Sequence, residues 1–463
     1  MQHKGYSVNE EALRIIDACE AWYKNEELND FHVRKNLNNQ EVHIARMNFA
    51  KRCCADDANL CEIISVSPEK KAKSQEFIDN LLTTNRFEVK YREQLEKTSA
   101  TGTVGAYIYL KDAEYVQPKG APVTVRGGDI RINYCDADCI IPLTVENGLI
   151  TECAFCATNK VRGREQTTLV IFLIENKFYQ AETVVFDHNG VIINDGPVVL
   201  QLGDVKPFAI MTNAEVNNLD NMEGYGLPKV YSAIPLFKAL DLCYAILYGD
   251  LSKGEKLLFI NELLAEINKK SDGSISLTPQ QKDLFVLLGE KLPQQDTLIQ
   301  EYNPQIRVGD ITKAFELVLS LLSISFGYGS KKYTFENGKI TTATEYIGTK
   351  QDSMQELNKQ RKQATDYISD IIHAAMWFAN AFQGASYDLT EALITEFDDS
   401  YVTDREAELE RKRNDAISFD IPKLKVWYLM DAYNLSEEEA LEMVSGAEEE
   451  KEKEDSNEED EED

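Results

Sequence analysis

The stretch Gly224-Tyr-Gly-Leu-Pro-Lys-Val-Tyr-Ser-Ala-Ile234 marks the point where the character of this chain changes. Short β-prone runs precede it, and a helical pattern follows Gly226. Pro235 has no amide hydrogen to donate, so we expect it in a first helical turn or at a kink. From Val230 onward the apolar residues fall on a single helical stripe, which is suited to packing against a neighbour: Ile234, Phe237, Leu240, Tyr244, Leu247 and Leu251.

The chain before this stretch has two parts. Apolar residues recur at helical spacing in residues 8–100, which predicts helices there. Residues 103–212 instead contain short β-prone runs separated by turn signals, which predicts antiparallel hairpins. The turn signals are Asn147-Gly148, Asn189-Gly190 and Asp195-Gly196, and the runs are 104–109, 123–132, 140–145, 169–174, 184–186 and 198–202.

The chain after residue 254 predicts further helices around a mixed insert. A strand is expected at 256–260. An apolar helix is expected at 310–326, and because its apolar residues occupy almost every face of the helix, we expect it to be buried on most sides. Residues 341–383 contain no proline, so they predict one helix of roughly 65 Å with Gly348 as its bend point. A small helical domain is expected at 387–444. The predicted fold class is therefore α+β.

Charge limits the functions that the chain can have. Its formal net charge is -30, and residues 448–463 hold twelve acidic residues and two lysines. We expect this acidic tail, 447–463, to be disordered. An acidic surface repels DNA and anionic membranes, which excludes a tight groove-reading DNA binder but not a protein that DNA passes through. No run of 18 apolar residues occurs, so no membrane span or signal peptide is predicted.

Nine cysteines, an odd number scattered over the chain, favour a reduced, cytosolic environment over a disulfide framework. Cys135-x3-Cys139 and Cys153-x2-Cys156 have spacings that could supply four thiolates to zinc. However, cysteines three apart on a strand point to opposite faces, and no glycine or proline turns the chain between Cys153 and Cys156. Small buried side chains are the favoured interpretation, and zinc is the alternative.

Other chemical signals are weak. The chain has no phosphate-binding loop, and its five histidines show no metal or triad spacing; His373 is expected to be structural. The pairs Asp56-Asp57 and Asp398-Asp399 could bind a cation, but such pairs are usually solvated. No catalytic residue, metal or cofactor is predicted, so the chain is expected not to be an enzyme.

Basic residues gather around the start of the long helix. They are Lys331, Lys332 and Lys339 in the preceding loop, and Lys350, Lys359, Arg361 and Lys362 in the helix. One interpretation is a solvated helix face on which Lys359 pairs with Glu356. The other is a ring of lysines that faces a polyanion, contributed by Lys331, Lys332, Lys339 and Lys350.

Several short stretches together carry a family resemblance. In chain order they are Asn48-Phe-Ala-Lys-Arg52, Ala55-Asp-Asp-Ala-Asn-Leu60, Thr101-Gly-Thr-Val-Gly-Ala-Tyr107, Lys206-Pro-Phe208, Gly224 to Ile234, Leu240-Asp241, Phe335 and Thr342-Ala-Thr-Glu345. They resemble the portal proteins of long-tailed bacteriophages of Gram-positive bacteria, over most of the chain and in the family's order. The match from Lys206 to Asp241 is the most specific, and the cysteine-rich strands and the acidic tail depart from the family.

The resemblance implies a portal fold with a mixed α/β wing, a two-helix stem, a small α/β clip, a long kinked tunnel helix and a helical crown. The implied ranges are 1–226 for the wing, 227–254 and 307–329 for the stem, 255–306 for the clip, 330–386 for the tunnel loop and long helix, and 387–446 for the crown.

The same resemblance implies a function. Such a protein forms a homo-oligomeric ring of about twelve subunits at one capsid vertex and is the channel for packaging and ejection of double-stranded DNA. Its partners are the terminase, the head-tail adaptor and the major capsid and scaffolding proteins, with no membrane. It is expected in the virion, after assembly in the host cytoplasm. The alternatives are an acidic scaffold or adaptor without a pore, and a cysteine-metal intracellular enzyme.

Overall fold

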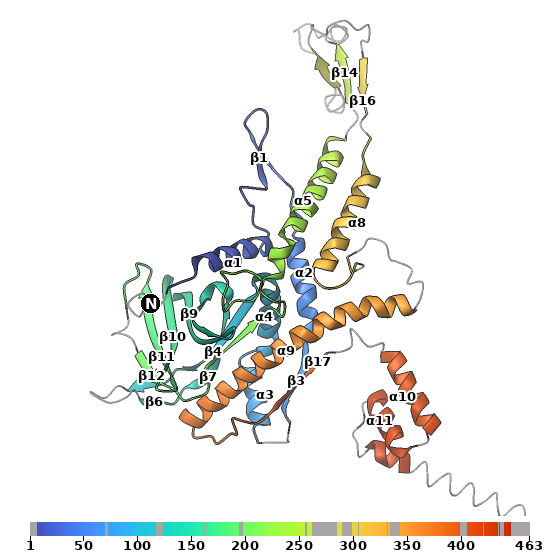
Figure 1. Cartoon of the computed structure of the whole chain (residues 1–463). Coiled ribbons are helices and arrows are strands. Elements are labelled where there is room, and N and C mark those ends of the chain that lie inside the picture. The colour runs from blue at the N-terminus through green and yellow to red at the C-terminus, as the bar shows by residue number, and fades with distance from the viewer. Residues whose placement is uncertain are drawn as a thin grey trace, which may run out of the picture. The chain divides into compact units, whose positions relative to one another are not determined.

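The computed structural model describes residues 7–69, 73–116, 124–161, 163–193, 198–254, 257–261, 285–288, 299–303, 305–330, 332–333, 343–398, 405–419, 421–433, 435 and 439–445. The chain divides into two compact units, Met1–Glu396 and Phe397–Asp463. The first contains both helices and sheets, which confirms the α+β class (Figure 1).

The first hundred residues are less uniformly helical than their periodicity predicts. Four helices form, and the side chain of Asn9 caps the first by accepting from the Ala12 amide at 3.1 Å. The prediction is wrong for β1, β2 and β3, which interrupt the helices; β3 pairs with β17, a strand from the far end of the unit. The elements are α1 Glu10–Tyr23, β1 Val33–Lys35, β2 Glu41–His43, α2 Phe49–Ala58, β3 Ile63–Pro68, α3 Gln75–Thr84, α4 Phe87–Thr101 and β17 Leu393–Phe397.

Two antiparallel sheets follow, as the turn signals predict. Five strands pair in the order β12-β11-β10-β9-β8 and three in the order β13-β4-β7. The β8–β9 turn uses Asn147 and Gly148, whose φ angles of 52° and 80° suit a tight hairpin. The strands are β4 Thr103–Lys111, β7 Asp129–Asp136, β8 Ile140–Glu146, β9 Leu149–Val161, β10 Arg164–Glu175, β11 Phe178–Asp187, β12 Val198–Gln201 and β13 Phe208–Thr212, with a small pair formed by β5 Glu114–Val116 and β6 Thr124–Arg126.

An aromatic core joins the two sheets. Phe155 of β9 and Phe172 of β10 lie on one sheet, with ring centroids 5.7 and 5.5 Å from Phe208 of β13 on the other. All three side chains are buried. The buried aromatic side chains of these strands therefore belong to one shared core between the sheets.

Two helices and a three-stranded sheet form a projection from this body (Figure 1). α5 spans Lys229–Lys253 and α8 spans Val308–Ser325, close to the range of 310–326 predicted for the second helix. Between them, β14 Leu257–Asn261 pairs with β15 Phe285–Leu288 in parallel and with β16 Ile299–Tyr302 in antiparallel orientation. Pro235 lies inside α5, past the first turn in which the sequence allowed it.

α9, Ala343–Phe382, confirms the prediction of one long helix, and its 40 residues make it about 60 Å long. It packs on β13 and β4, and Gln360 accepts a hydrogen bond from the Ala214 amide at 2.9 Å. The helix continues across Gly348, so a bend at that residue stays a prediction.

The second unit is a small set of helices, α10 Arg405–Phe419, α11 Pro422–Tyr433 and a short helical segment at 439–445. Val426, Ala440 and Val444 form its core. The sequence predicted a helical domain from residue 387, which is wrong at its start because β17 is a strand. The acidic tail from 447 lies outside the described residues.

Candidate functional site

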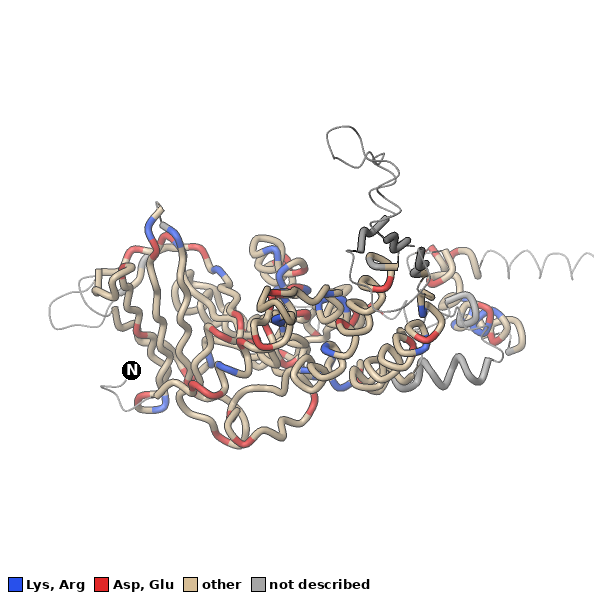
Figure 2. The backbone as a smooth tube through the Cα atoms, turned by 90° about the horizontal axis from the view of Figure 1, so that it is seen from above, with Lys and Arg blue, Asp and Glu red and all other residues tan. Residues whose placement is uncertain are grey.

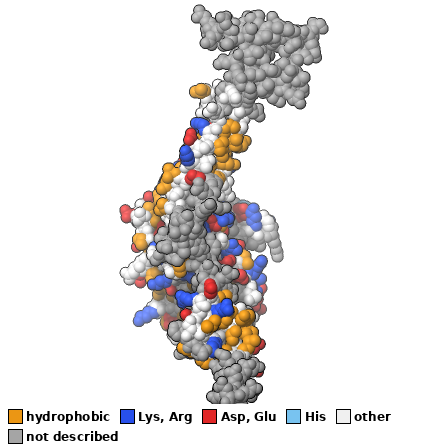
Figure 3. All heavy atoms as spheres, turned by 90° about the vertical axis from the view of Figure 1, so that its right-hand side faces the viewer, with side chains coloured by type: hydrophobic (Ala, Val, Ile, Leu, Met, Phe, Trp, Pro, Cys, Tyr) orange, Lys and Arg blue, Asp and Glu red, His pale blue; other side chains and the backbone are white. Residues whose placement is uncertain are grey.

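The outer face of α8 is apolar and open. The helix buries Ile311, Phe315 and Leu319, and it packs along α5. On the opposite face Leu317 is 63 % exposed, and Leu321 and Ile324, at helical spacing from it, are exposed as well. Figure 3 shows hydrophobic side chains along this side of the projection. The sequence predicted that this helix is buried on most sides, and that prediction is wrong for a single copy of the chain.

α5 divides into two halves. Its first half is anchored in the body by Val230, Phe237 and Leu240, but beyond Asp241 its residues are at most half-buried. Ile246, Tyr248 and Leu251 are exposed. Together with the α8 face, this half leaves six large apolar side chains exposed on the projection, and exposed apolar surface of this kind marks interaction sites.

By length and composition alone, the segment Lys229–Ser252 of α5 could cross a membrane. Among the described residues, one helix meets these criteria. A core helix of a protein outside membranes meets the same two criteria. The finding shows how apolar α5 is, although the sequence has no uninterrupted apolar run of that length.

A buried ion cluster lies at the start of α5, inside the body. Lys229 is 2 % exposed, and its Nζ lies 2.9 Å from Asp57 of α2 and 3.1 Å from Glu356 of α9. The hydroxyl of Tyr328, just after α8, donates to Asp57 at 2.8 Å. Lys359 approaches Glu356 from the surface at 3.4 Å. Three helices and the end of a fourth therefore meet at one lysine, and we call Lys229, Asp57, Glu356 and Tyr328 the basal cluster.

The protonation of the basal cluster follows from its charges. Burial by itself lowers the pKa of Lys229, but Asp57 and Glu356 outweigh it and raise that pKa well above the usual range. The ammonium group is therefore charged at any ordinary pH. Burial also raises the pKa of the neighbouring Glu215, and Glu356 and Asp57 add to that rise while Lys229 opposes it.

The acidic pair Asp56-Asp57 is not the solvated surface pair that the sequence favoured. Asp56 is buried and accepts from Arg52, with Nε to Oδ2 and Nη2 to Oδ1 both at 3.0 Å. Asp57 faces Lys229 instead. Both carboxylates are thus committed to basic side chains of the chain itself. Asp399 of the other acidic pair lies outside the described residues.

The predicted channel lysines are only partly described. Lys331 and Lys339 lie outside the described residues, and Lys350 belongs to α9. Lys332 is half-buried, with its Nζ 5.5 Å from the centre of the Tyr328 ring, so it lies next to the basal cluster. The Lys359–Glu356 contact confirms the charge pair predicted for that part of the helix. A lysine ring stays a prediction. Figure 2 shows basic positions interspersed with acidic ones over the described body.

The cysteines are free thiols, and most are buried. Cys153 is buried in β9, while Cys156, three residues later on the opposite face, is half-exposed. Burial raises the pKa of Cys139 to about 12, helped by Asp138, which leaves this thiol protonated and weakly reactive at neutral pH. In the described part of the chain, no three His, Cys, Asp or Glu side chains gather as they would around a metal ion.

Two histidines have structural roles. His373 Nε2 donates to the Glu391 carbonyl at 2.9 Å, in line with the structural role expected for it. His32 is 1 % exposed, and it accepts at Nδ1 from the Leu28 amide, so Nε2 carries the proton and donates to Asp241 at 3.1 Å. This contact could not be predicted from local pattern, because 209 residues separate the partners.

A cavity of about 460 Å³ lies against the five-stranded sheet. Its described lining is made of neutral side chains, including Tyr107, Val170, Phe172 and Phe378. These side chains offer a ligand apolar contact area and a few hydroxyl and amide groups.

Comparison with known proteins adds no identity to this geometry. Neither a scan against protein-family models nor a search of curated proteins gives a match to the chain.

Proposed function

We propose that this chain is the portal subunit of a long-tailed bacteriophage. It would assemble into a ring of about twelve copies at one capsid vertex and provide the channel for packaging and ejection of double-stranded DNA. The observation that carries the proposal is the projection: two apolar helices, open to water on their outer faces, with a small sheet at their far end. The order of elements along the chain also agrees with the layout that the resemblance implies.

The open faces of α5 and α8 support assembly rather than a monomer. Burial of apolar surface contributes about 25 cal/mol per Å², so exposed leucines and isoleucines on adjoining helices favour association. A ring of identical subunits uses head-to-tail contacts between two different faces, and it closes when each step turns by the same angle. A rigid projection anchored by the basal cluster is suited to such a constant angle.

The charge of the chain supports a conduit that does not hold its cargo. Duplex DNA carries one negative charge per about 1.7 Å of axis, so a strongly basic channel would bind it tightly. The chain is acidic, with a net charge of -30. A sparse set of lysines at Lys331, Lys332, Lys339 and Lys350 would centre the duplex while leaving it mobile. Force would come from a terminase docked at the β14–β16 sheet, with the head-tail adaptor at the same end after packaging.

The test is the assembly state of the full chain. Electron microscopy and mass photometry of purified protein are expected to show closed rings of about twelve subunits with a hole wide enough for a duplex. A monomer at micromolar concentration would refute the proposal. An open assembly without a hole would instead support the scaffold or adaptor alternative. A metal found in stoichiometric amount with the cysteines would support the enzyme alternative.

A further inference from the structure

The β1–β2 hairpin ends in a tight, hydrogen-bonded turn. Asn36 organises the turn Asn36–Gln40: its amide donates to the Gln40 carbonyl, and its side-chain oxygen accepts from the amides of Asn38 and Gln40, all at 2.9 Å. Asn39 adopts a φ of 62° that asparagine tolerates. Leu37 stands at this tip and is fully exposed, at 107 %. The hairpin therefore presents Leu37 at its tip, and Val42 of β2 is exposed as well.

The base of the hairpin is fixed to α5. Asp241 accepts from His32 Nε2 at 3.1 Å and from the Met47 amide at 2.9 Å, so a single carboxylate holds both ends of the hairpin. Phe31 packs beside Trp22, with ring centroids 6.1 Å apart. The direction in which the hairpin leaves the body is thus set by buried contacts.

Beyond this base the hairpin is exposed. β1 and β2 pair over three residues each, from Val33↔His43 to Lys35↔Glu41, and most of their side chains are exposed. A two-stranded ribbon alone in water is marginally stable at best. A partner that covers Leu37 and the neighbouring strands would therefore stabilise it.

We infer that the hairpin tip of one copy docks on the open face of α8 in the next copy, with Leu37 against Leu317, Leu321 and Ile324. In Figure 1 the hairpin rises on one side of α5 while α8 lies on the other. A contact between these two faces is heterologous, the type that builds a ring. The inference rests on the proposed function and names the contact that would close the ring.

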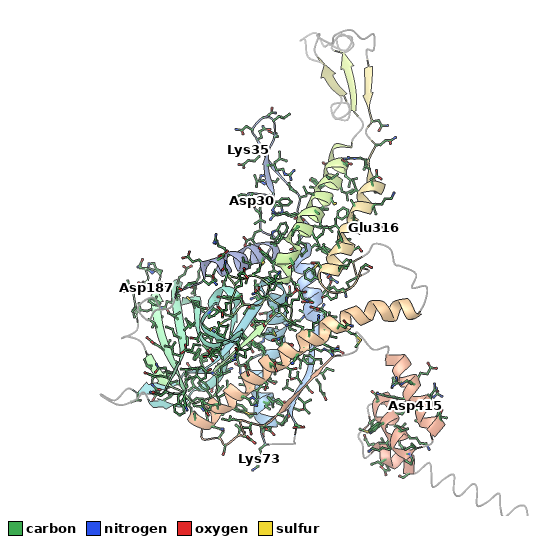
Figure 4. The ribbon with its side chains drawn as sticks, in the orientation of Figure 1. Asp30, Lys35, Lys73, Asp187, Glu316 and Asp415 are labelled. Atoms are coloured by element: carbon green, nitrogen blue, oxygen red, sulfur yellow. The ribbon has the colours of Figure 1, made fainter. Side chains whose placement is uncertain are left out.

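Charge agrees with a second copy as the occupant. Arg34 and Lys35 are exposed on β1 and Glu41 on β2, so residues 33–42 carry a net charge of +1 in a chain whose net charge is -30. α8 carries Asp310 in line with its apolar face, Lys313 at the edge of that face and Glu316 on the flank, so its charged side chains sum to -1. Figure 4 labels Lys35 on the hairpin and Glu316 on α8. An acidic copy of the same chain is thus a complementary partner for the hairpin.

Photocrosslinking of the full chain tests the contact. A benzophenone amino acid replaces Leu37 in a tagged copy, which is assembled with untagged copies and irradiated. Mass spectrometry is expected to find crosslinks from position 37 to the untagged copy within Val308–Ser325. The matched control carries the same group at Leu149, another exposed leucine beside a hairpin turn, and is expected to give no crosslink to that helix.

Variants give a second readout. Leu37→Asp and Leu321→Asp are each expected to weaken subunit association about tenfold or more, since each puts a charge in an apolar contact. Leu149→Asp is expected to leave it unchanged. Lys35→Glu is expected to weaken association at low salt, and Glu316→Lys in the same chain to restore it.

The outcomes separate the two proposals. Rings that form normally but give no crosslink to α8 overturn the docking inference alone. Crosslinks from position 37 to added duplex DNA, with none to α8, would show that the basic hairpin binds nucleic acid and would overturn it as well. A chain that stays monomeric overturns both the inference and the proposed function.

Discussion

Replacing Lys229 by Met removes the only basic side chain that lies between Asp57 and Glu356 in the described basal cluster. Lys229 Nζ is 2.9 and 3.1 Å from these carboxylates, whose side chains are 12 % and 9 % exposed. Methionine has a similar length, so the loss is one of charge more than of packing. Removing one partner of a buried ion pair costs about 3–5 kcal/mol of stability, because the other charge stays buried without compensation.

The structure indicates where in that range the value lies. Two carboxylates lose the same partner, and a third acid, Glu215, lies nearby. Both facts favour a loss in the upper part of the range of about 3–5 kcal/mol. Against this, Tyr328 still donates to Asp57, and Lys359 still lies 3.4 Å from Glu356. We expect a loss of about 4 kcal/mol for Lys229→Met.

Hydrogen exchange measured by mass spectrometry is the assay, because a chain with two units need not unfold in one step. Faster exchange is expected around Glu356 in α9 and at the start of α5, at a fixed protomer concentration. The matched control is Lys160→Met: its pair with Glu165 spans 3.6 Å, and both side chains are mostly exposed. The control is expected to cost about 0–1 kcal/mol.

A compensating variant distinguishes charge from shape. Lys229→Met combined with Asp57→Asn and Glu356→Gln leaves a neutral cluster, and it is expected to recover most of the lost stability. The reasoning is refuted if the amides of α9 exchange as slowly in Lys229→Met as they do in the Lys160→Met control. It is also refuted if the neutral triple variant is less stable than the single one.

Three further predictions follow from charge and exposure. Deleting residues 448–463 is expected to leave ring assembly unchanged in mass photometry, because this segment has no apolar anchor; loss of oligomers would show that it is structural. Replacing Lys331, Lys332 and Lys339 by Ser is expected to leave assembly intact but to change the salt dependence of DNA packaging and retention in phage. If phage with this triple variant package and retain DNA as well as wild type across a range of salt concentrations, the proposed ring of lysines is wrong. Burial raises the pKa of Glu215 above its usual 4.5, so folding favours the protonated form and stability falls as pH rises through the window above 4.5. Glu215→Gln is therefore expected to raise the melting temperature at neutral pH and to have no effect well below pH 4.5, and an equal effect at both pH values would contradict this account.

The long elements could be predicted because their signals are local. The helix expected at 341–383 is found at Ala343–Phe382, and the strand expected at 256–260 at Leu257–Asn261. Uninterrupted helical periodicity and β-prone runs between turn signals are visible within a few residues of sequence. The turn between β10 and β11 was harder to recognise, since Asn176 and Lys177 both take positive φ without a glycine.

The missed features depend on distant partners. β3 pairs with β17, and Ser65 in β3 donates to Glu396 across 331 residues of sequence. Lys229 lies 172 residues from Asp57. A lysine at the start of an apolar helix, and an acidic pair inside the helix Phe49–Ala58, were the available signals. Neither identifies the other, because pairing across such distances is set by tertiary packing and not by local pattern.

The two buried charged residues of α5 anchor the start of the projection. Lys229 ties the start of the helix to α2 and α9, and Asp241, about 18 Å further along, ties the β1–β2 hairpin to it. Beyond Asp241 the helix packs along α8, and Asp250 pairs with Arg307, just before α8, at 3.0 Å, so Lys229 and Asp241 anchor the half of the helix that lies in the body. A ring closes only if every subunit presents its two contact faces at the same angle, since a small variation gives an open helix instead. Buried ionic contacts suit this task because they require specific partners, whereas apolar contacts alone would tolerate a range of angles. We therefore expect changes at Lys229 to broaden the distribution of subunit numbers, and changes at Leu37 to weaken assembly without broadening it.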